Sequence, residues 1–280
     1  MLMSTKANRY AHALLKARNG GTLLPLLTED GKLTSEDAYD IARSLLNIRI
    51  ANGETPVGRK IVFSNRRVQQ LYGKTEAIAE PIWTTMFDSS VSFALDNIGE
   101  HSLGKAQQPR VEPHIVFKLA RTPAADATLD DIADSLEWMA HGLEIAVSPF
   151  KNWEFDSADA VAAFGLHRQL VVGEPRMLSR QSRHSLPEVL AAGSLSLSKS
   201  LADQSQLCAA GFGKELSGSP LHALLWLHQH LQQQSGFAPL QAGEIIATGS
   251  WTNPQPVKRG EVWSTAFGQL NVPGLSVSLS

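Results

Sequence analysis

The stretch VEPHIVFKL, residues 111–119, decides the fold of this chain. Its apolar side chains and the alternating positions of its polar ones predict a β-strand. Successive side chains of a strand point to opposite faces, so Glu112 and His114 lie on the same face. Pro113 cannot donate a ladder hydrogen bond, which predicts that the strand begins at an edge or a bulge.

A second apolar stretch, LEIAV at residues 143–147, predicts a neighbouring strand that carries one carboxylate, Glu144. An unpaired carboxylate in such a run would cost roughly several kcal/mol, so Glu144 requires a partner. Glu112, His114 and Glu144 together are a workable ligand set for a divalent cation. A Glu-x-His pair alone is more often a solvated strand face. The metal site is therefore a hypothesis that depends on Glu144.

The order of predicted elements indicates a helical beginning and a strand-rich body. Apolar spacing over residues 38–48, after the capping pair Thr34 and Asp37, predicts a helix that ends at Gly53. Thr128 to His141 also has a helical pattern, which Gly142 would stop. Further strands are predicted over residues 57–63, 244–248, 261–267 and 275–279. We expect a helical portion over residues 1–55 packed on a body over residues 56–280, together one structural unit.

Composition and missing motifs exclude several classes of protein. The 25 Lys and Arg residues face 27 Asp and Glu residues, so there is no basic excess for a nucleic acid or an anionic membrane. The single cysteine, Cys208, rules out an intrachain disulfide framework, and no apolar run reaches the roughly 18 residues of a membrane span. Neither a dinucleotide fingerprint, a phosphate loop nor a Gly-x-Ser-x-Gly elbow occurs. These features predict a cytoplasmic protein without nucleic-acid or membrane partners.

Two further charged residues, Lys60 and Asp88, lie in or next to apolar stretches of the sequence. Lys60 lies in the middle of the predicted strand 57–63, where its ammonium either reaches solvent or faces a polar pocket, and from the residues alone we favour solvent. Asp88 follows the apolar stretch 81–87, and its commoner role there is to cap a helix or form a turn.

Seven segments of the chain recur in the same order in one family. Together they resemble the 2-keto-4-pentenoate hydratase and 4-oxalocrotonate decarboxylase group of the fumarylacetoacetate hydrolase superfamily. The likeness extends from about the thirtieth residue to the C-terminus. It implies an α+β fold of the fumarylacetoacetate hydrolase type, with a mixed, β-barrel-like sheet, flanking helices and the helical N-terminal portion. The segments are residues 33–39, 57–61, 81–83, 112–117, 142–145, 218–221 and 242–249.

The resemblance also implies a site. In the family's Glu-x-Glu motif the first carboxylate matches Glu112 and the later ligand matches Glu144, whereas His114 departs from the pattern by replacing the second glutamate. The implied cation is Mg²⁺ or Mn²⁺, and an imidazole ligand at position 114 favours Mn²⁺, Fe²⁺ or Zn²⁺ over Mg²⁺. Lys60 and Asp88 match positions associated with the active site and are candidates for proton transfer or orientation. The remaining candidates, for the substrate carboxylate, are Ser64, Arg66, Thr248 and Gly249.

The reaction that the resemblance implies is a metal-dependent lyase reaction on 2-oxo acids or their enols. We expect hydration of a 2-hydroxy-dienoate in the catabolism of aromatic compounds, by a homo-oligomer. Decarboxylation of a 4-oxalocrotonate-like diacid and hydrolysis of an acylpyruvate are alternatives. His114 and the divergent stretches at residues 147–148 and 164–167 motivate another: a non-catalytic subunit that forms a complex with a decarboxylase or hydratase of the same pathway.

Overall fold

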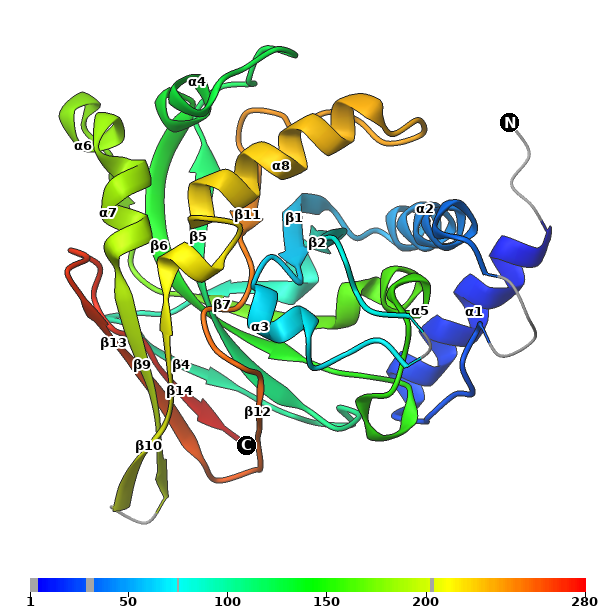
Figure 1. The fold of residues 1–280 in the computed structure, drawn as a ribbon. Coiled ribbons are helices and arrows are strands. Elements are labelled where there is room, and N and C mark those ends of the chain that lie inside the picture. The colour runs from blue at the N-terminus through cyan, green and yellow to red at the C-terminus, as the bar shows by residue number, and fades with distance from the viewer. Residues whose placement is uncertain (1–4, 29–32, 75, 202–203) are drawn as a thin grey trace.

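The computed structural model describes residues 5–28, 33–74, 76–201 and 204–280, and contains two β-sheets with helices around them (Figure 1). The larger sheet has the strand order β2-β1-β11-β5-β6-β7-β3, with β12 paired to β5 and β8 paired to β6. It curls into a half-barrel, which confirms the predicted α+β fold with a mixed, barrel-like sheet. Its strands are β1 (Pro56–Val62), β2 (Ile82–Phe87), β3 (Val91–Phe93), β5 (Arg110–Leu119), β6 (Leu136–Ala146), β7 (His167–Val172), β8 (Arg176–Met177), β11 (Ile245–Ala247) and β12 (Gln255–Pro256).

The smaller sheet has the order β10-β9-β13-β14-β4 and lies beside the half-barrel (Figure 1). It is built mainly from antiparallel neighbours, with β14 and β4 parallel at one edge. Its strands are β4 (Ile98–His101), β9 (Ser194–Leu201), β10 (Gln204–Phe212), β13 (Val262–Gly268) and β14 (Ser276–Leu279).

Helices surround the larger sheet, with α8 along one side and α1, α2 and α5 along another (Figure 1). The predicted capping box is present at the start of α2: the Asp37 main-chain N–H donates to Thr34 Oγ1, and the Thr34 N–H donates to Asp37 Oδ2, both at 3.1 Å. The helices are α1 (Thr5–Gly20), α2 (Ser35–Ala51), α3 (Arg66–Gln69), α4 (Leu129–Asp134), α5 (Ser157–Ala162), α6 (Arg180–His184), α7 (Leu186–Ala192) and α8 (Pro220–Gln233), with 3-10 turns η1 (Asp88–Ser90), η2 (Lys151–Trp153), η3 (Phe164–Leu166) and η4 (Gly213–Glu215).

Two local predictions around the central strands are wrong. The helix predicted from Thr128 to His141 ends at Asp134, and the chain enters β6 two residues later. Pro113 lies inside β5 between other strands, rather than at an edge or a bulge. The ladder tolerates it because Pro113 falls between the residues of β5 that pair with β12 and those that pair with β11. The segment between β11 and β12, residues 248–254, passes this interruption and reaches the candidate site.

The interior of the half-barrel is apolar below the charged residues of the site. Val116 lies two positions after His114 on the same face of β5, and Ala140 and Ala247 are its neighbours on β6 and β11. All three are fully buried in an apolar cluster that also includes Leu170 and Val172. Charged side chains directly above this cluster therefore interact in a region of low dielectric constant.

Helix α1 and the turn that follows it are tied to the body by side-chain hydrogen bonds. Gln107 Nε2 donates to the main-chain oxygens of Ala17 and Thr22, and Arg18 donates to the carbonyl oxygens of His167 and Arg168. The division of the chain near residue 55 stays a prediction. Among the described residues, no helix combines the length and the apolar character that crossing a bilayer requires.

Candidate active site

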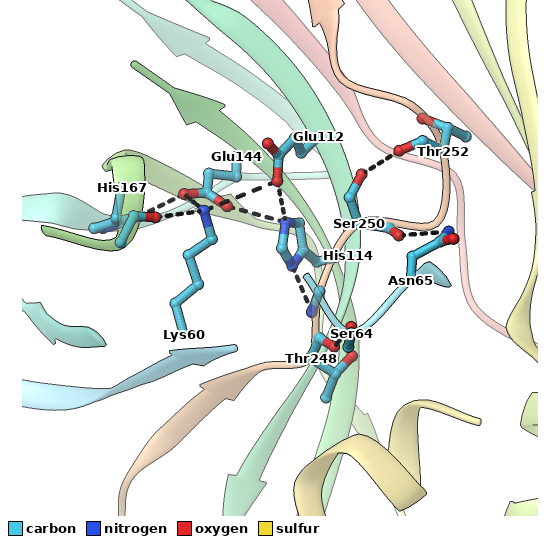
Figure 2. A network of polar contacts seen from close by, with 12 residues as sticks. Lys60, Ser64, Asn65, Glu112, His114, Glu144, His167, Thr248, Ser250 and Thr252 are labelled. Atoms are coloured by element: carbon cyan, nitrogen blue, oxygen red, sulfur yellow. Dashed lines mark hydrogen bonds and ion pairs between the residues drawn. The ribbon is translucent and has the colours of Figure 1, made fainter. Parts of the chain in front are cut away.

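Glu112 on β5 and Glu144 on β6 face each other directly in the antiparallel ladder, and His114 lies on the same face one pleat further along (Figure 2). Their ligand atoms all lie within 4.8 Å of one another, and all three residues are buried. The structure thus brings the three predicted metal-site residues together. Like charges directly opposite in a ladder are destabilising, so this pair of carboxylates requires positive charge nearby.

Lys60 supplies part of that charge from β1. Its Nζ lies 2.6 Å from Glu144 Oε1 and 3.8 Å from Glu112 Oε2, and it also donates to the Gly165 carbonyl oxygen at 3.4 Å. The side chain is completely buried, so the interpretation that it reaches solvent is wrong. The curl of the sheet lets a residue of β1 reach carboxylates on β5 and β6 across the interior of the half-barrel (Figure 2).

Glu144 is held as a carboxylate by its surroundings. Complete burial raises its pKa, but the charge of Lys60 and the interactions with His114 and His167 outweigh burial and leave the pKa well below its ordinary value. One of its oxygens, Oε1, is bound by Lys60 and His167. The other, Oε2, is buried and has no aligned hydrogen-bond partner among the described residues.

His167, which the sequence reasoning did not select, is the second neighbour of Glu144. Its Nδ1 donates to Glu144 Oε1 at 2.9 Å, and its Nε2 lies 3.0 Å from Ser90 Oγ. Burial lowers the pKa of His167 to about 4, despite the nearby carboxylate, so the ring is neutral at pH 7. His167 is the first residue of β7, and no sequence spacing connects it to Glu144, so the sequence gives no signal that would select it.

His114 is fixed through the surroundings of both ring nitrogens. The Gly249 main-chain N–H donates to His114 Nδ1 at 3.1 Å, while Nε2 lies 3.0 Å from Glu144 Oε2 and 3.5 Å from Glu112 Oε2. Burial lowers the pKa of His114, but the two carboxylates outweigh it, and the net direction is upward.

Three of the predicted substrate-binding residues lie on two loops that follow parallel strands, β1 and β11 (Figure 2). Ser64 Oγ donates to the Thr248 carbonyl oxygen at 2.8 Å, and Thr248 Oγ1 donates to the Ile115 carbonyl oxygen at 2.8 Å. Gly249 has φ +108°, and a Cβ there would lie 1.9 Å from Ser64 Oγ, so this close approach requires glycine. The loops are therefore locked together beside His114.

Two predicted residues lie outside this cluster. Arg66 is on α3 and exposed to solvent. Asp88 is also exposed, and its Oδ1 accepts hydrogen bonds from the main-chain N–H groups of Thr55 and Ser89. Since Lys60 pairs with Thr84, Asp88 lies four residues further along, about 13 Å away along the strand. The structure places Asp88 in an exposed turn outside the cluster, and its predicted role in proton transfer or orientation stays a prediction.

The donor set fits a divalent cation through the two glutamates. Carboxylate oxygens are the ligands that Mg²⁺ and Mn²⁺ prefer, and buried Glu144 Oε2 lacks a hydrogen-bond partner among the described residues. His114 Nε2 is the second buried atom of the cluster without a hydrogen-bond partner, since neither carboxylate oxygen lies in line with it. The cluster therefore has two buried polar atoms that a bound group could satisfy.

Comparison with curated proteins identifies relatives along nearly the whole chain. The 2-hydroxyhexa-2,4-dienoate hydratase of Comamonas testosteroni is 30% identical over 265 residues, which cover 92% of this chain and 91% of that protein. The 2-keto-4-pentenoate hydratase of Paraburkholderia xenovorans (strain LB400) is 28% identical over 255 residues, covering 90% and 88%. A 4-oxalocrotonate decarboxylase of a Pseudomonas species is 27% identical over 255 residues, covering 91% of each chain.

Solved structures agree with these relatives on the fold. The 4-oxalocrotonate decarboxylase from Pseudomonas putida G7, complexed with magnesium and adipate, superposes with a TM-score of 0.84 over 100% of this chain and 99% of that one, at 21% identity. Likeness at this level of identity shows the fold alone. No protein-family model matches the chain. With a relative 30% identical along nearly its full length, the chain belongs to the 2-keto-4-pentenoate hydratase and 4-oxalocrotonate decarboxylase group.

Proposed function

We propose that this protein is a metal-dependent lyase that adds water to the enol of a 2-oxo acid, a 2-hydroxy-dienoate. The observation that carries the proposal is the pair of buried, facing carboxylates, Glu112 and Glu144, with the Lys60 ammonium 2.6 Å from one of them. The names of the relatives, which include two hydratases acting on such substrates, support the choice of reaction.

The charges of the cluster support a divalent cation. His114 accepts a hydrogen bond at Nδ1 from the Gly249 N–H, which only a neutral ring can do. Lys60 and the two glutamates therefore give the cluster a charge of −1, which repels an anionic 2-oxo acid. A divalent cation on Glu112 and Glu144 reverses the sign and, when bound, supplies Lewis-acid stabilisation of the enolate worth several kcal/mol. We propose Mg²⁺ or Mn²⁺, in keeping with the hard oxygen ligands of the two glutamates. The softer transition metals suggested by His114 stay a prediction.

Lys60 is the proposed proton-carrying group. Its Nζ is held in place by Glu144 Oε1 and by the Gly165 carbonyl oxygen, and solvent does not reach it. A positioned acid of this kind contributes typically 10²- to 10⁴-fold to a proton-transfer step. Glu144 thus has two tasks, since one of its oxygens fixes Lys60 and the other is free for the cation.

The loops after β1 and β11 are the proposed site for the substrate carboxylate. Ser64, Thr248 and Gly249 meet there beside His114, and their hydrogen bonds fix the loop geometry before a substrate arrives. A rigid site of this kind positions an anion at low entropic cost. Arg66, exposed on the adjacent α3, stays a predicted contact.

Turnover of a 2-hydroxy-dienoate, followed by loss of dienol absorbance, tests the proposal. We expect activity that disappears with chelator, returns with Mg²⁺ or Mn²⁺, and falls more than 100-fold in Glu144→Gln. Glu137→Gln is the matched control, because Glu137 is a carboxylate on the same strand that is about one-third exposed and paired with Lys118. Full turnover in the presence of chelator or in Glu144→Gln would rule out the proposed mechanism.

A second reaction has support from one relative, the 4-oxalocrotonate decarboxylase. Both reactions pass through an enolate, so the same cluster serves either one. Release of carbon dioxide from a 2-oxo diacid would identify the decarboxylase, and a hydrated product from the dienoate would identify the hydratase. The predicted cytoplasmic location, homo-oligomeric assembly and complex with a pathway enzyme stay predictions.

A further inference from the structure

The hydrogen-bond state of His114 follows from its neighbour Gly249. A main-chain N–H group can only donate, and the Gly249 N–H lies 3.1 Å from His114 Nδ1. Nδ1 must therefore present a lone pair. A neutral imidazole has one donor and one acceptor nitrogen, so its hydrogen is on Nε2. An imidazolium has a hydrogen on both ring nitrogens and could not accept the Gly249 hydrogen bond at Nδ1, so this geometry corresponds to the neutral ring.

The position of the Gly249 N–H is built into the fold. Thr248, the preceding residue, makes two hydrogen bonds to the Ile115 carbonyl oxygen, from its main-chain N–H at 3.1 Å and from Oγ1 at 2.8 Å. Its own carbonyl oxygen accepts from Ser64 Oγ at 2.8 Å. The peptide that donates to His114 is therefore anchored on both sides, and the ring cannot exchange its nitrogens' roles without breaking this arrangement.

A metal ligand needs the opposite arrangement. Histidine binds a metal through an unprotonated nitrogen, while the other ring nitrogen donates its hydrogen to a carbonyl or carboxylate oxygen. In His114 the nitrogen that faces the two glutamates carries the hydrogen, and the other nitrogen is an acceptor. The histidine at the position of the family's second glutamate is thus unsuited to replace it as a ligand.

The Nε2–H group nevertheless points into the site. It is completely buried, it lies among Glu112, Glu144 and Lys60, and it has no aligned acceptor among the described residues. A buried donor left unpaired costs about 1–3 kcal/mol, which a bound acceptor recovers. The acceptor expected at this place is an oxygen of the substrate, next to the cation that the two carboxylates hold.

We propose that His114 is a substrate-binding donor rather than a metal ligand: its Nε2–H hydrogen-bonds an oxygen of the 2-oxo acid or enol, while Glu112 and Glu144 alone supply protein ligands to the cation. The proposal rests on the proposed function for the identity of the substrate. It gives a chemical reason for the histidine at the position of the family's second glutamate. A glutamate there would bind the ion, whereas the His114 Nε2–H binds the developing enolate oxygen of the substrate.

The hydrogen-bond state is tested first, in the metal-free protein. Long-range ¹H–¹⁵N NMR of the histidine-labelled chain, with His114→Gln to assign the signals, distinguishes the ring tautomers. We expect a hydrogen on Nε2 and none on Nδ1. A hydrogen on Nδ1 with a bare Nε2 would overturn the proposal, whether or not the protein proves to be a lyase.

The ligand set is tested with Mn²⁺ as the probe. Pulsed EPR of bound Mn²⁺ detects a directly coordinated ¹⁴N, and we expect no such coupling. We also expect His114→Gln to bind Mn²⁺ within threefold of the wild type, and Glu144→Gln to bind at least tenfold more weakly. A coordinated ¹⁴N, or a tenfold loss in His114→Gln, would show that His114 is a ligand and would leave the proposed function intact.

The substrate contact is tested with oxalate, which mimics the chelating end of a 2-oxo acid, on the Mn²⁺-loaded protein. His114→Met removes the donor, and we expect oxalate to bind about tenfold more weakly, as for a lost hydrogen bond to a charged group. His114→Gln keeps an N–H donor and should recover part of that loss. Equal oxalate affinity in wild type and His114→Met would overturn the donor role. If the wild type takes up no Mn²⁺ at millimolar concentration, the proposed function fails, and the tautomer measurement still decides the state of His114.

Discussion

Lys60 Nζ and Glu144 Oε1 form an ion pair 2.6 Å long in which both side chains are fully buried. Removing one partner of a buried pair leaves an uncompensated charge, which costs about 3–5 kcal/mol. We therefore expect Lys60→Met to lower the free energy of unfolding by about that amount in urea titrations. The double variant Lys60→Met/Glu144→Gln should recover part of the loss, because it removes the charge of Glu144 and leaves only that of Glu112.

The control for this experiment is the pair Lys118 and Glu137, 3.0 Å apart and one-third exposed on strands of the same sheet. Exposed pairs contribute about 0–1 kcal/mol, so Lys118→Met should change stability by no more than that. Equal effects of the two lysine substitutions would show that burial does not set the contribution of these ion pairs.

The lowered pKa of His141 predicts how the free energy of unfolding changes at acidic pH. Burial lowers its pKa to about 3 from the ordinary 6.5, although its Nδ1 hydrogen-bonds the His114 carbonyl oxygen. The unfolded chain then binds more protons than the folded one between these two values, so stability falls as the pH drops below about 6.5. We expect His141→Gln to flatten this part of a plot of unfolding midpoint against pH. Substitution of the exposed His184 by Gln is the control and should leave the slope unchanged.

Gly249 and Gly243 offer a matched test of loop packing. Both have positive φ, +108° and +88°, but a Cβ at Gly249 would lie 1.9 Å from Ser64 Oγ, whereas Gly243 has nothing within 4 Å of that position. Alanine at either position carries the backbone strain, and only at Gly249 does it also meet a fixed side chain. Overpacking typically costs 1–3 kcal/mol. Gly249→Ala should therefore be less stable than Gly243→Ala by at least about 1 kcal/mol in thermal or urea unfolding.

Substitution of Asp88 tests whether this residue takes part in the reaction. Its carboxylate accepts two main-chain hydrogen bonds at an exposed turn, and asparagine keeps one such acceptor. Asp88→Asn should retain kcat within about twofold, whereas Lys60→Gln should lose at least 100-fold, the lower end expected for a proton-transfer group. A loss in Asp88→Asn comparable to that in Lys60→Gln would return Asp88 to the active site.

The sequence predicts the relative position of site residues best where they lie on the same strand. The two-residue spacing of Glu112 and His114 fixes their common face whatever surrounds them, and the apolar run around Glu144 demanded a partner. The environment of Lys60 could not be inferred in this way, since it depends on the curl that brings β1 across to β6. His167 likewise reaches Glu144 through tertiary packing, which no local period encodes.

The predicted helix from Thr128 to His141 shows the same limit at the level of secondary structure. Its start was correct, because the Thr128 and Asp131 capping box is a local interaction, and α4 does begin there. Its continuation failed because the residues after Ser135 are buried on both faces of β6, and a strand buried on both faces has no alternating pattern that separates it from a helix.

The short strand β11 has a consequence for how the molecule is made. It lies between β1 and β5, so two strands that are complete early in synthesis stay separated until residues near the C-terminus arrive to join them. A growing chain released before Ile245 retains the pairs β1–β2 and β5–β6 but lacks the strand that joins them. The same late segment leads directly to Gly249, which orients His114. Assembly of the half-barrel and completion of the polar cluster are therefore one event, and a shortened product would lose its architecture along with its chemistry.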